Sequence, residues 1–202
     1  MVQVKICGLT SVADVEIVNR YLPDYVGFVF APGKRQVTLA QAVELAAAVS
    51  KDIKKVGVFV NCPREQVKVI ANACNLDILQ FHGQESPVDC YGYKYPIWKA
   101  FNVKDAASLV EIKNYDVAGI LVDSYHPQVL GGTGVSFDWS LVKELSQREF
   151  LILAGGLNVS NLEDAITLVQ PAVVDVSSGV ESNGRKDEMK IKQFIEKARK
   201  LR

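Results

Sequence analysis

Short apolar runs rich in β-branched residues alternate along the chain with longer segments in which apolar residues recur at helical spacing. The short runs predict eight strands: Val2–Cys7, Tyr25–Phe30, Lys55–Val60, Ile78–Phe81, Ile97–Ala100, Gly119–Val122, Leu151–Ala154 and Val173–Val176. The longer segments predict helices over Ser11–Arg20, Leu39–Ser50, Pro63–Ala73, Lys104–Lys113, Ser140–Gln147, Asn158–Val169 and Lys186–Leu201, with a short one near Pro87–Tyr91. The strands begin 19 to 32 residues apart, which is the spacing of one strand and one helix per repeat.

Eight strands that each lead into a helix predict an α/β protein with a single (β/α)8 TIM barrel over residues 1–202. The alternative is an open, doubly wound parallel sheet. Eight parallel strands would make a wide open sheet, and no Gly-x-Gly-x-x-Gly motif opens the first helix, so the closed barrel is favoured. The flexible-looking stretch Glu181-Ser182-Asn183-Gly184 is too short for an interdomain linker and is predicted to be a loop before the last helix.

Composition narrows the class of protein. With 23 basic and 23 acidic side chains the formal net charge is zero, which argues against a nucleic-acid surface or a polybasic membrane patch. No apolar run reaches the ~20 residues of a membrane-spanning helix, and the N-terminus lacks the layout of a secretory signal. The four cysteines form no Cys-x-x-Cys pair and only two histidines are present, so we expect neither a zinc site nor a disulfide framework. The expectation is a soluble, cytoplasmic, globular protein.

Glycine-rich sequences follow the seventh and eighth predicted strands. They are Ala154-Gly155-Gly156-Leu157 and Ser177-Ser178-Gly179. Glycines let backbone N–H groups approach an anion closely, and loops after strands seven and eight commonly bind phosphate in this fold. Tight turns are the alternative interpretation, but two such loops at adjacent strand ends favour a phosphate site made by Gly155, Gly156, Ser177, Ser178 and Gly179.

Alternation along the first strand places Lys5 and Cys7 on the face opposite Val4 and Ile6. If Val4 and Ile6 pack against helices, Cys7 projects into the barrel mouth, where a thiol is a nucleophile, a base or an inert core residue. Asp123, at the end of the sixth strand, faces the same mouth or else caps a turn.

The same parity buries Lys5 below Cys7, where an ammonium needs a carboxylate partner. Asp175 is the candidate, because the eighth strand neighbours the first in a closed barrel.

Two loops carry further candidates. Arg35, in Ala31-Pro32-Gly33-Lys34-Arg35, could pair with a substrate carboxylate or be a solvated loop charge. Gly131-Gly132-Thr133-Gly134, which follows a loop containing His126, suggests a mobile lid, a second anion contact or a plain flexible loop.

Several motifs occur together in a characteristic order. They are Lys5-Ile6-Cys7-Gly8, Val26-Gly27-Phe28-Val29-Phe30, Gly57-Val58-Phe59-Val60, Gln80-Phe81-His82-Gly83, Gly131-Gly132-Thr133-Gly134-x-x-Phe137-Asp138-Trp139, Ala154-Gly155-Gly156-Leu157-Asn158 and Asp175-Val176-Ser177-Ser178-Gly179-Val180-Glu181. In this ordered set, from residue 2 to about 188, the sequence closely resembles the phosphoribosylanthranilate isomerase family of tryptophan biosynthesis.

The resemblance implies a cofactor-free Amadori rearrangement of N-(5-phosphoribosyl)anthranilate to 1-(2-carboxyphenylamino)-1-deoxyribulose 5-phosphate. It assigns the general base, which must be ionised, to Cys7 and the general acid, which must start protonated with a raised pKa, to Asp123. It implies that Arg35 holds the anthranilate carboxylate, that the two glycine-rich loops hold the phosphate, and that His82 and Asp175 lie near the substrate. It also implies a small-molecule phosphosugar partner, no metal, no nucleic acid and no membrane, and it leaves the oligomeric state open.

Three other functions compete with this interpretation. A histidine-pathway isomerase would use two aspartates, and Cys7 in place of the first argues against it. A non-catalytic phosphate-binding barrel would bind a phosphate analogue without turnover. A cysteine hydrolase using Cys7 and His82 would need a strand–turn–helix nucleophile elbow, which the sequence lacks.

Overall fold

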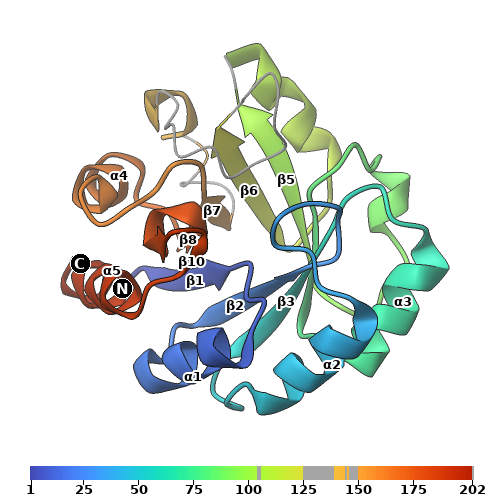
Figure 1. Cartoon of the computed structure of the whole chain (residues 1–202). Coiled ribbons are helices and arrows are strands. Elements are labelled where there is room, and N and C mark those ends of the chain that lie inside the picture. Colours follow the sequence, from blue (N-terminus) through green and yellow to red (C-terminus); the bar gives the residue numbers. More distant parts are fainter. Residues whose placement is uncertain (104–105, 125–138, 144, 146–149, 202) are drawn as a thin grey trace.

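The computed structural model describes residues 1–103, 106–124, 139–143, 145 and 150–201. Its eight parallel strands form a closed barrel in the order of the sequence (Figure 1). The strands are β1 Gln3–Cys7, β2 Tyr25–Val29, β3 Lys54–Phe59, β4 Ile78–Phe81, β5 Ile97–Val103, β6 Gly119–Ser124, β7 Leu151–Leu153 and β8 Val173–Val176. β8 pairs with β1 and closes the ring, so the predicted (β/α)8 barrel is confirmed and the open sheet is excluded.

Helices surround the barrel in the gaps between strands (Figure 1). The α-helices are α1 Val12–Tyr21, α2 Leu39–Ala48, α3 Arg64–Ala73, α4 Leu162–Val169 and α5 Glu188–Lys200. Thr38 caps α2 as a capping box with Gln41, because each side chain bonds the other's backbone N–H. The 3-10 helices that the structure describes in other gaps are η1 Val88–Cys90, η2 Ala106–Asn114, η3 Trp139–Val142 and η5 Ser178–Val180.

Four predicted helices differ from those observed. The segments predicted as Lys104–Lys113 and Ser140–Gln147 form the 3-10 elements η2 and η3 where the structure describes them. The predicted helix Asn158–Val169 begins only at Leu162, because the Asn158 side chain accepts from the backbone N–H groups of Ser160 and Asn161 and builds a turn. The last helix begins after Asp187, which caps it by accepting from the backbone N–H of Lys190.

The stretch predicted as a flexible loop before α5 is instead a hairpin. β9 (Glu181–Ser182) pairs antiparallel with β10 (Arg185–Lys186). Asn183 and Gly184 make the two-residue turn with φ of 52° and 75°, the left-handed region that an Asn-Gly turn favours. The register places Lys186 opposite Glu181, so these two oppositely charged side chains lie close together.

Side chains alternate between the barrel interior and the layer under the helices. Val4 and Ile6 are fully buried in the large core shared by strands and helices, as the alternation predicts. A second apolar cluster fills the barrel interior: Tyr25, Val56, Ile78, Trp98, Ala100, Leu121, Ile152, Ala154 and Val173. On β4, β6 and β8 the next inward residues after Ile78, Leu121 and Val173 are polar, so a polar layer lies on an apolar plug.

Candidate active site

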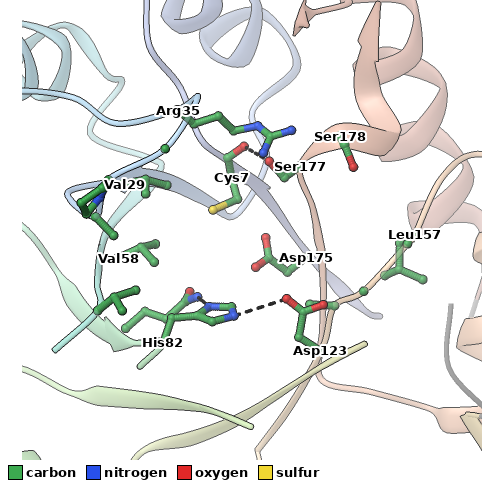
Figure 2. Close-up of a pocket in the computed structure, with 18 residues that line it drawn as sticks. Cys7, Val29, Arg35, Val58, His82, Asp123, Leu157, Asp175, Ser177 and Ser178 are labelled. Carbon is green, nitrogen blue, oxygen red and sulfur yellow. Dashed lines mark hydrogen bonds and ion pairs between the residues drawn. The ribbon is translucent and has the colours of Figure 1, made fainter. Parts of the chain in front are cut away.

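A cavity of about 350 Å³ lies at the carboxyl ends of the strands (Figure 2). Nine of the ten candidate residues line it: Cys7, Arg35, His82, Asp123, Gly155, Gly156, Asp175, Ser177 and Ser178. They come from β1, β6 and β8 and from the loops that follow β2, β4, β7 and β8. The structure therefore brings together side chains that are up to 171 residues apart in the sequence, from Cys7 to Ser178.

Gly179, the tenth candidate, is not one of the lining residues. A Cβ atom at this position would lie 1.8 Å from the backbone oxygen of Leu157, which no side chain tolerates. Gly179 thus lets the loop after β8 pack directly against the loop after β7. Gly155 and Gly156, by contrast, line the cavity with φ of 81° and 67°, the left-handed conformation that glycine adopts at little cost.

Cys7 ends β1 with its thiol pointing into the cavity (Figure 2). Its side chain has room because β2 carries Gly27 alongside: a Cβ there would lie 2.8 Å from Cys7 Sγ and 3.3 Å from Lys5 Cε. Burial raises the pKa of the Cys7 thiol, and the nearby Lys5 ammonium only partly opposes this effect. The thiol therefore sits beside a cation and is still held mainly in its protonated form, which differs from the ionised base that the resemblance implies, because burial outweighs the charge of Lys5.

Lys5 and Asp175 form the buried ion pair that the sequence predicted. The register of β1 with β8 sets the two residues opposite each other, and Lys5 Nζ lies 2.8 Å from Asp175 Oδ2. Burial lowers the pKa of Lys5, but the charges and hydrogen bonds of Asp175 and Cys7 together outweigh it, so the net pKa of Lys5 is raised. The second oxygen, Asp175 Oδ1, is buried and has no hydrogen-bond partner among the described residues.

Asp123 faces the cavity from β6, across from Cys7 (Figure 2). His82, in the loop after β4, places its Nε2 atom 3.3 Å from Asp123 Oδ2. The other ring nitrogen, Nδ1, lies 2.9 Å from Nε2 of Gln80, an inward-facing residue of β4 that also lines the cavity. The sequence analysis assigned no role to Gln80, although its alternation with Ile78 places it inside the barrel.

Arg35 extends over the cavity mouth from the loop after β2 and is not a solvated loop charge. Its Nε and Nη2 atoms donate to Glu181 Oε1 and Oε2 at 2.7 and 2.9 Å, a bidentate pair. Lys186 donates to Glu181 Oε1 at 2.9 Å and to the backbone oxygen of Ser177 at 3.0 Å. Burial alone would raise the pKa of Glu181, but the bonds from Arg35 and Lys186 lower it to about 2.

The ends of β1 and β8 are joined next to this network. Ser177 Oγ donates to the backbone oxygen of Cys7 at 3.0 Å. A chain of contacts thus runs from Arg35 through Glu181, Lys186 and Ser177 to the backbone of Cys7. Sequence reasoning missed Glu181 and Lys186, because both were assigned to segments whose hairpin pairing has no periodic signal.

Some predictions fall outside what the structure describes. Gly131-Gly132-Thr133-Gly134 and His126 lie in the range 125–138, which is not among the described residues. Within the described ranges no group of three or more His, Cys, Asp or Glu side chains is placed to hold a metal ion. Nor, in that part of the chain, does any helix have the length and apolar character needed to cross a membrane.

The family model described as N-(5'phosphoribosyl)anthranilate (PRA) isomerase matches residues 4–197, a range that includes every candidate residue of the cavity. The chain belongs to the PRA isomerase family. The N-(5'-phosphoribosyl)anthranilate isomerase of Thermoanaerobacter pseudethanolicus is 48% identical to it over 100% of both chains. This membership confirms the resemblance seen in the sequence and makes the chain an isomerase rather than a hydrolase.

Solved PRA isomerases share the fold over the whole chain. The crystal structure of the enzyme from Thermotoga maritima has a TM-score of 0.91 and 36% identity, with 100% of both chains covered. A PRA isomerase in complex with reduced 1-(o-carboxyphenylamino)-1-deoxyribulose 5-phosphate has a TM-score of 0.87 and 35% identity, again over 100% of both chains.

Proposed function

We propose that the chain converts N-(5-phosphoribosyl)anthranilate to 1-(2-carboxyphenylamino)-1-deoxyribulose 5-phosphate in tryptophan biosynthesis, with Cys7 as general base and Asp123 as general acid. The observation that carries the assignment is the position of these two side chains, which face one cavity from opposite sides (Figure 2). A sugar held between them presents its ring oxygen to one group and its C2 proton to the other.

Each step of the proposed mechanism moves one proton. Asp123 in its acid form protonates the furanose ring oxygen, the bond from that oxygen to C1 breaks, and the amine nitrogen's electron pair forms an iminium. Cys7, having released its thiol proton to solvent, then removes the proton from C2 as a thiolate, and the electrons of the C–H bond neutralise the iminium to give an enolamine. Tautomerisation moves a proton from the C2 hydroxyl to C1 and gives the ketone, and Asp123 regains a proton from solvent. The sequence involves no net oxidation, and both the acid and the base are side chains of the protein.

The phosphate and the anthranilate carboxylate, at opposite ends of the substrate, would be bound by different groups of the protein. The loops containing Gly155, Gly156, Ser177 and Ser178 offer backbone N–H groups and hydroxyls to the phosphate, and Gly179 allows these loops to approach each other. Arg35 would bind the anthranilate carboxylate while Glu181 holds the guanidinium in place. Asp175 Oδ1 would accept a hydrogen bond from a sugar hydroxyl.

We place the enzyme in the cytoplasm, acting on a small phosphosugar rather than on nucleic acid or a membrane. All four cysteines are free thiols in the structure, and the proposed base is one of them. Free thiols persist in a reducing compartment such as the cytoplasm, where disulfides rarely form.

Steady-state assays that follow the fluorescence of phosphoribosylanthranilate as it is consumed test the proposal. We expect Cys7→Ser and Asp123→Asn each to lower kcat by at least about 100-fold, the contribution typical of a positioned acid or base, while circular dichroism shows an intact fold. Cys62→Ser is the matched control, because Cys62 is partly exposed and lies outside this cavity. Near-normal turnover in either site variant would contradict the role proposed for that residue. If the unaltered chain bound the reduced product analogue but showed no turnover, the protein would be a binding protein and not an isomerase.

A further inference from the structure

Gln80 is a buried amide for which the proposed mechanism has no use. It lies on β4 with its side chain inside the barrel, is 1% exposed, and lines the cavity. Its Nε2 atom lies 2.9 Å from His82 Nδ1, whereas its Oε1 atom has no hydrogen-bond partner among the described residues. A buried amide group without a hydrogen-bond partner destabilises the fold. The contact that Gln80 makes with His82 therefore needs an explanation.

The explanation follows from where protons can lie on the ring of His82. The amide N–H group of Gln80 lies against Nδ1, and a ring nitrogen that accepts from an N–H donor must carry a lone pair. The proton of a neutral imidazole therefore belongs on the far nitrogen, Nε2. Nε2 lies 3.3 Å from Asp123 Oδ2 and has no hydrogen-bond partner among the described residues, so its N–H is available to a carboxylate that forms there.

We infer that Gln80 is a positioning residue that holds His82 as the Nε2–H tautomer, so that the imidazole donates to the carboxylate of Asp123. Gln80 acts through His82 and need not touch the reacting atoms. The inference rests on the proposed role of Asp123: once this residue has protonated the ring oxygen, its buried side chain is left as a carboxylate. The Nε2–H group stabilises that carboxylate, whereas the opposite tautomer would place a lone pair against it.

The tautomer of His82 can be measured without any turnover. The chain contains only two histidines, so ¹⁵N-histidine labelling gives two pairs of ring-nitrogen signals, and His82→Asn identifies the pair from residue 82. In the unaltered protein we expect a protonated Nε2 and an unprotonated Nδ1 at His82. A spectrum with the proton on Nδ1 would overturn the inference, whatever the variants do.

Two substitutions then test whether the tautomer matters for the reaction. Gln80→Met keeps the length of the side chain but removes the donor, so we expect a mixture of tautomers and a kcat about 10- to 100-fold lower, with KM changed by less than about twofold. Gln80→Glu offers an acceptor instead, so it should move the proton to Nδ1 and lower kcat further. Gln66→Met, at an exposed position of α3, is the matched control and should change neither readout.

The outcome is separable from that of the proposed function. If Asp123→Asn retains turnover, the acid assignment fails. The tautomer of His82 is measured on the unaltered protein, so that measurement does not depend on this result. If Asp123→Asn is inactive but Gln80→Met retains both kcat and a single Nε2–H tautomer, the role of Gln80 fails alone. Should Gln80→Glu not fold with a carboxylate inside the barrel, the unaltered protein and Gln80→Met still decide the question.

Discussion

Replacing Glu181 by glutamine tests the network that holds Arg35 over the cavity. The Glu181 side chain is only 11% exposed and accepts from both Arg35 and Lys186, and the Lys186 side chain is 1% exposed. Glu181→Gln keeps the shape of the side chain but removes the negative charge that both cations face. The variant should therefore be less stable at neutral pH, and the difference should depend on pH.

The magnitude follows from the pKa of Glu181. It lies at about 2 in the folded protein, against 4.5 for an ordinary glutamate, a difference of about 2.5 pH units. At ~1.4 kcal/mol per unit, the ionised carboxylate contributes roughly 3 kcal/mol to the free energy of unfolding at pH 7. Because the folded-state pKa is lowered, this contribution is present above pH 4.5 and is lost as the pH falls toward 2. The same relation leaves ~2.6 kcal/mol at pH 4 and ~0.4 kcal/mol at pH 2.

Urea unfolding at a series of pH values, followed by tryptophan fluorescence, measures this contribution. The difference between the unaltered protein and Glu181→Gln cancels the carboxylates that both share. It should be at least roughly 3 kcal/mol at pH 7 and shrink by ~2 kcal/mol between pH 4 and pH 2. Glu16→Gln, at an exposed position of α1, controls for the loss of one negative charge and should differ little from the unaltered protein. A difference for Glu181→Gln that stays constant over this range would refute the reasoning.

Two further substitutions probe the cavity. Arg35→Ala should raise KM for the substrate by ~10-fold or more but weaken a phosphate-only ligand far less, because the guanidinium would contact the carboxylate end; equal weakening of both ligands would contradict that contact. Gly27→Ala would place a methyl group 2.8 Å from Cys7 Sγ, so it should displace the thiol and lower kcat. Gly57→Ala, which crowds Leu76 and Phe59, is its control and should cost stability without lowering kcat; similar kcat losses in both variants would contradict the steric argument.

Features that depend on regular periodicity could be predicted from the sequence. Alternation along β1 placed Lys5 and Cys7 inside the barrel, and closure of the ring put β8 next to β1. Together these two rules predict the Lys5–Asp175 pair that the structure shows. The strands could be predicted for the same reason, because eight apolar runs, each followed by a helical segment, have few ways to pack into one sheet.

Features that depend on short or irregular backbone could not be predicted in this way. The hairpin that presents Glu181 has strands of two residues, too short to show alternation, and its only local signal was Asn183-Gly184. The partner of Glu181 is Arg35, 146 residues earlier, and no periodic rule relates two loops at that separation. Gly179 was assigned to phosphate from its neighbours, whereas its tight approach to Leu157 depends on how two loops pack.

The charges around the cavity bear on how a buried thiol can act as a base. Lys5 is paired with Asp175, whereas Arg35 and Lys186 share the single carboxylate of Glu181, so these five side chains carry one net positive charge. Burial nevertheless raises the pKa of the thiol, and a neutral thiol does not repel a substrate that carries a phosphate and a carboxylate. In the proposed mechanism, ring opening creates an iminium cation between Asp123 and Cys7, and this positive charge stabilises a nearby thiolate. The basicity of Cys7 would thereby be coupled to the acid step, because a thiolate becomes favourable in the cavity only after Asp123 has protonated the ring oxygen.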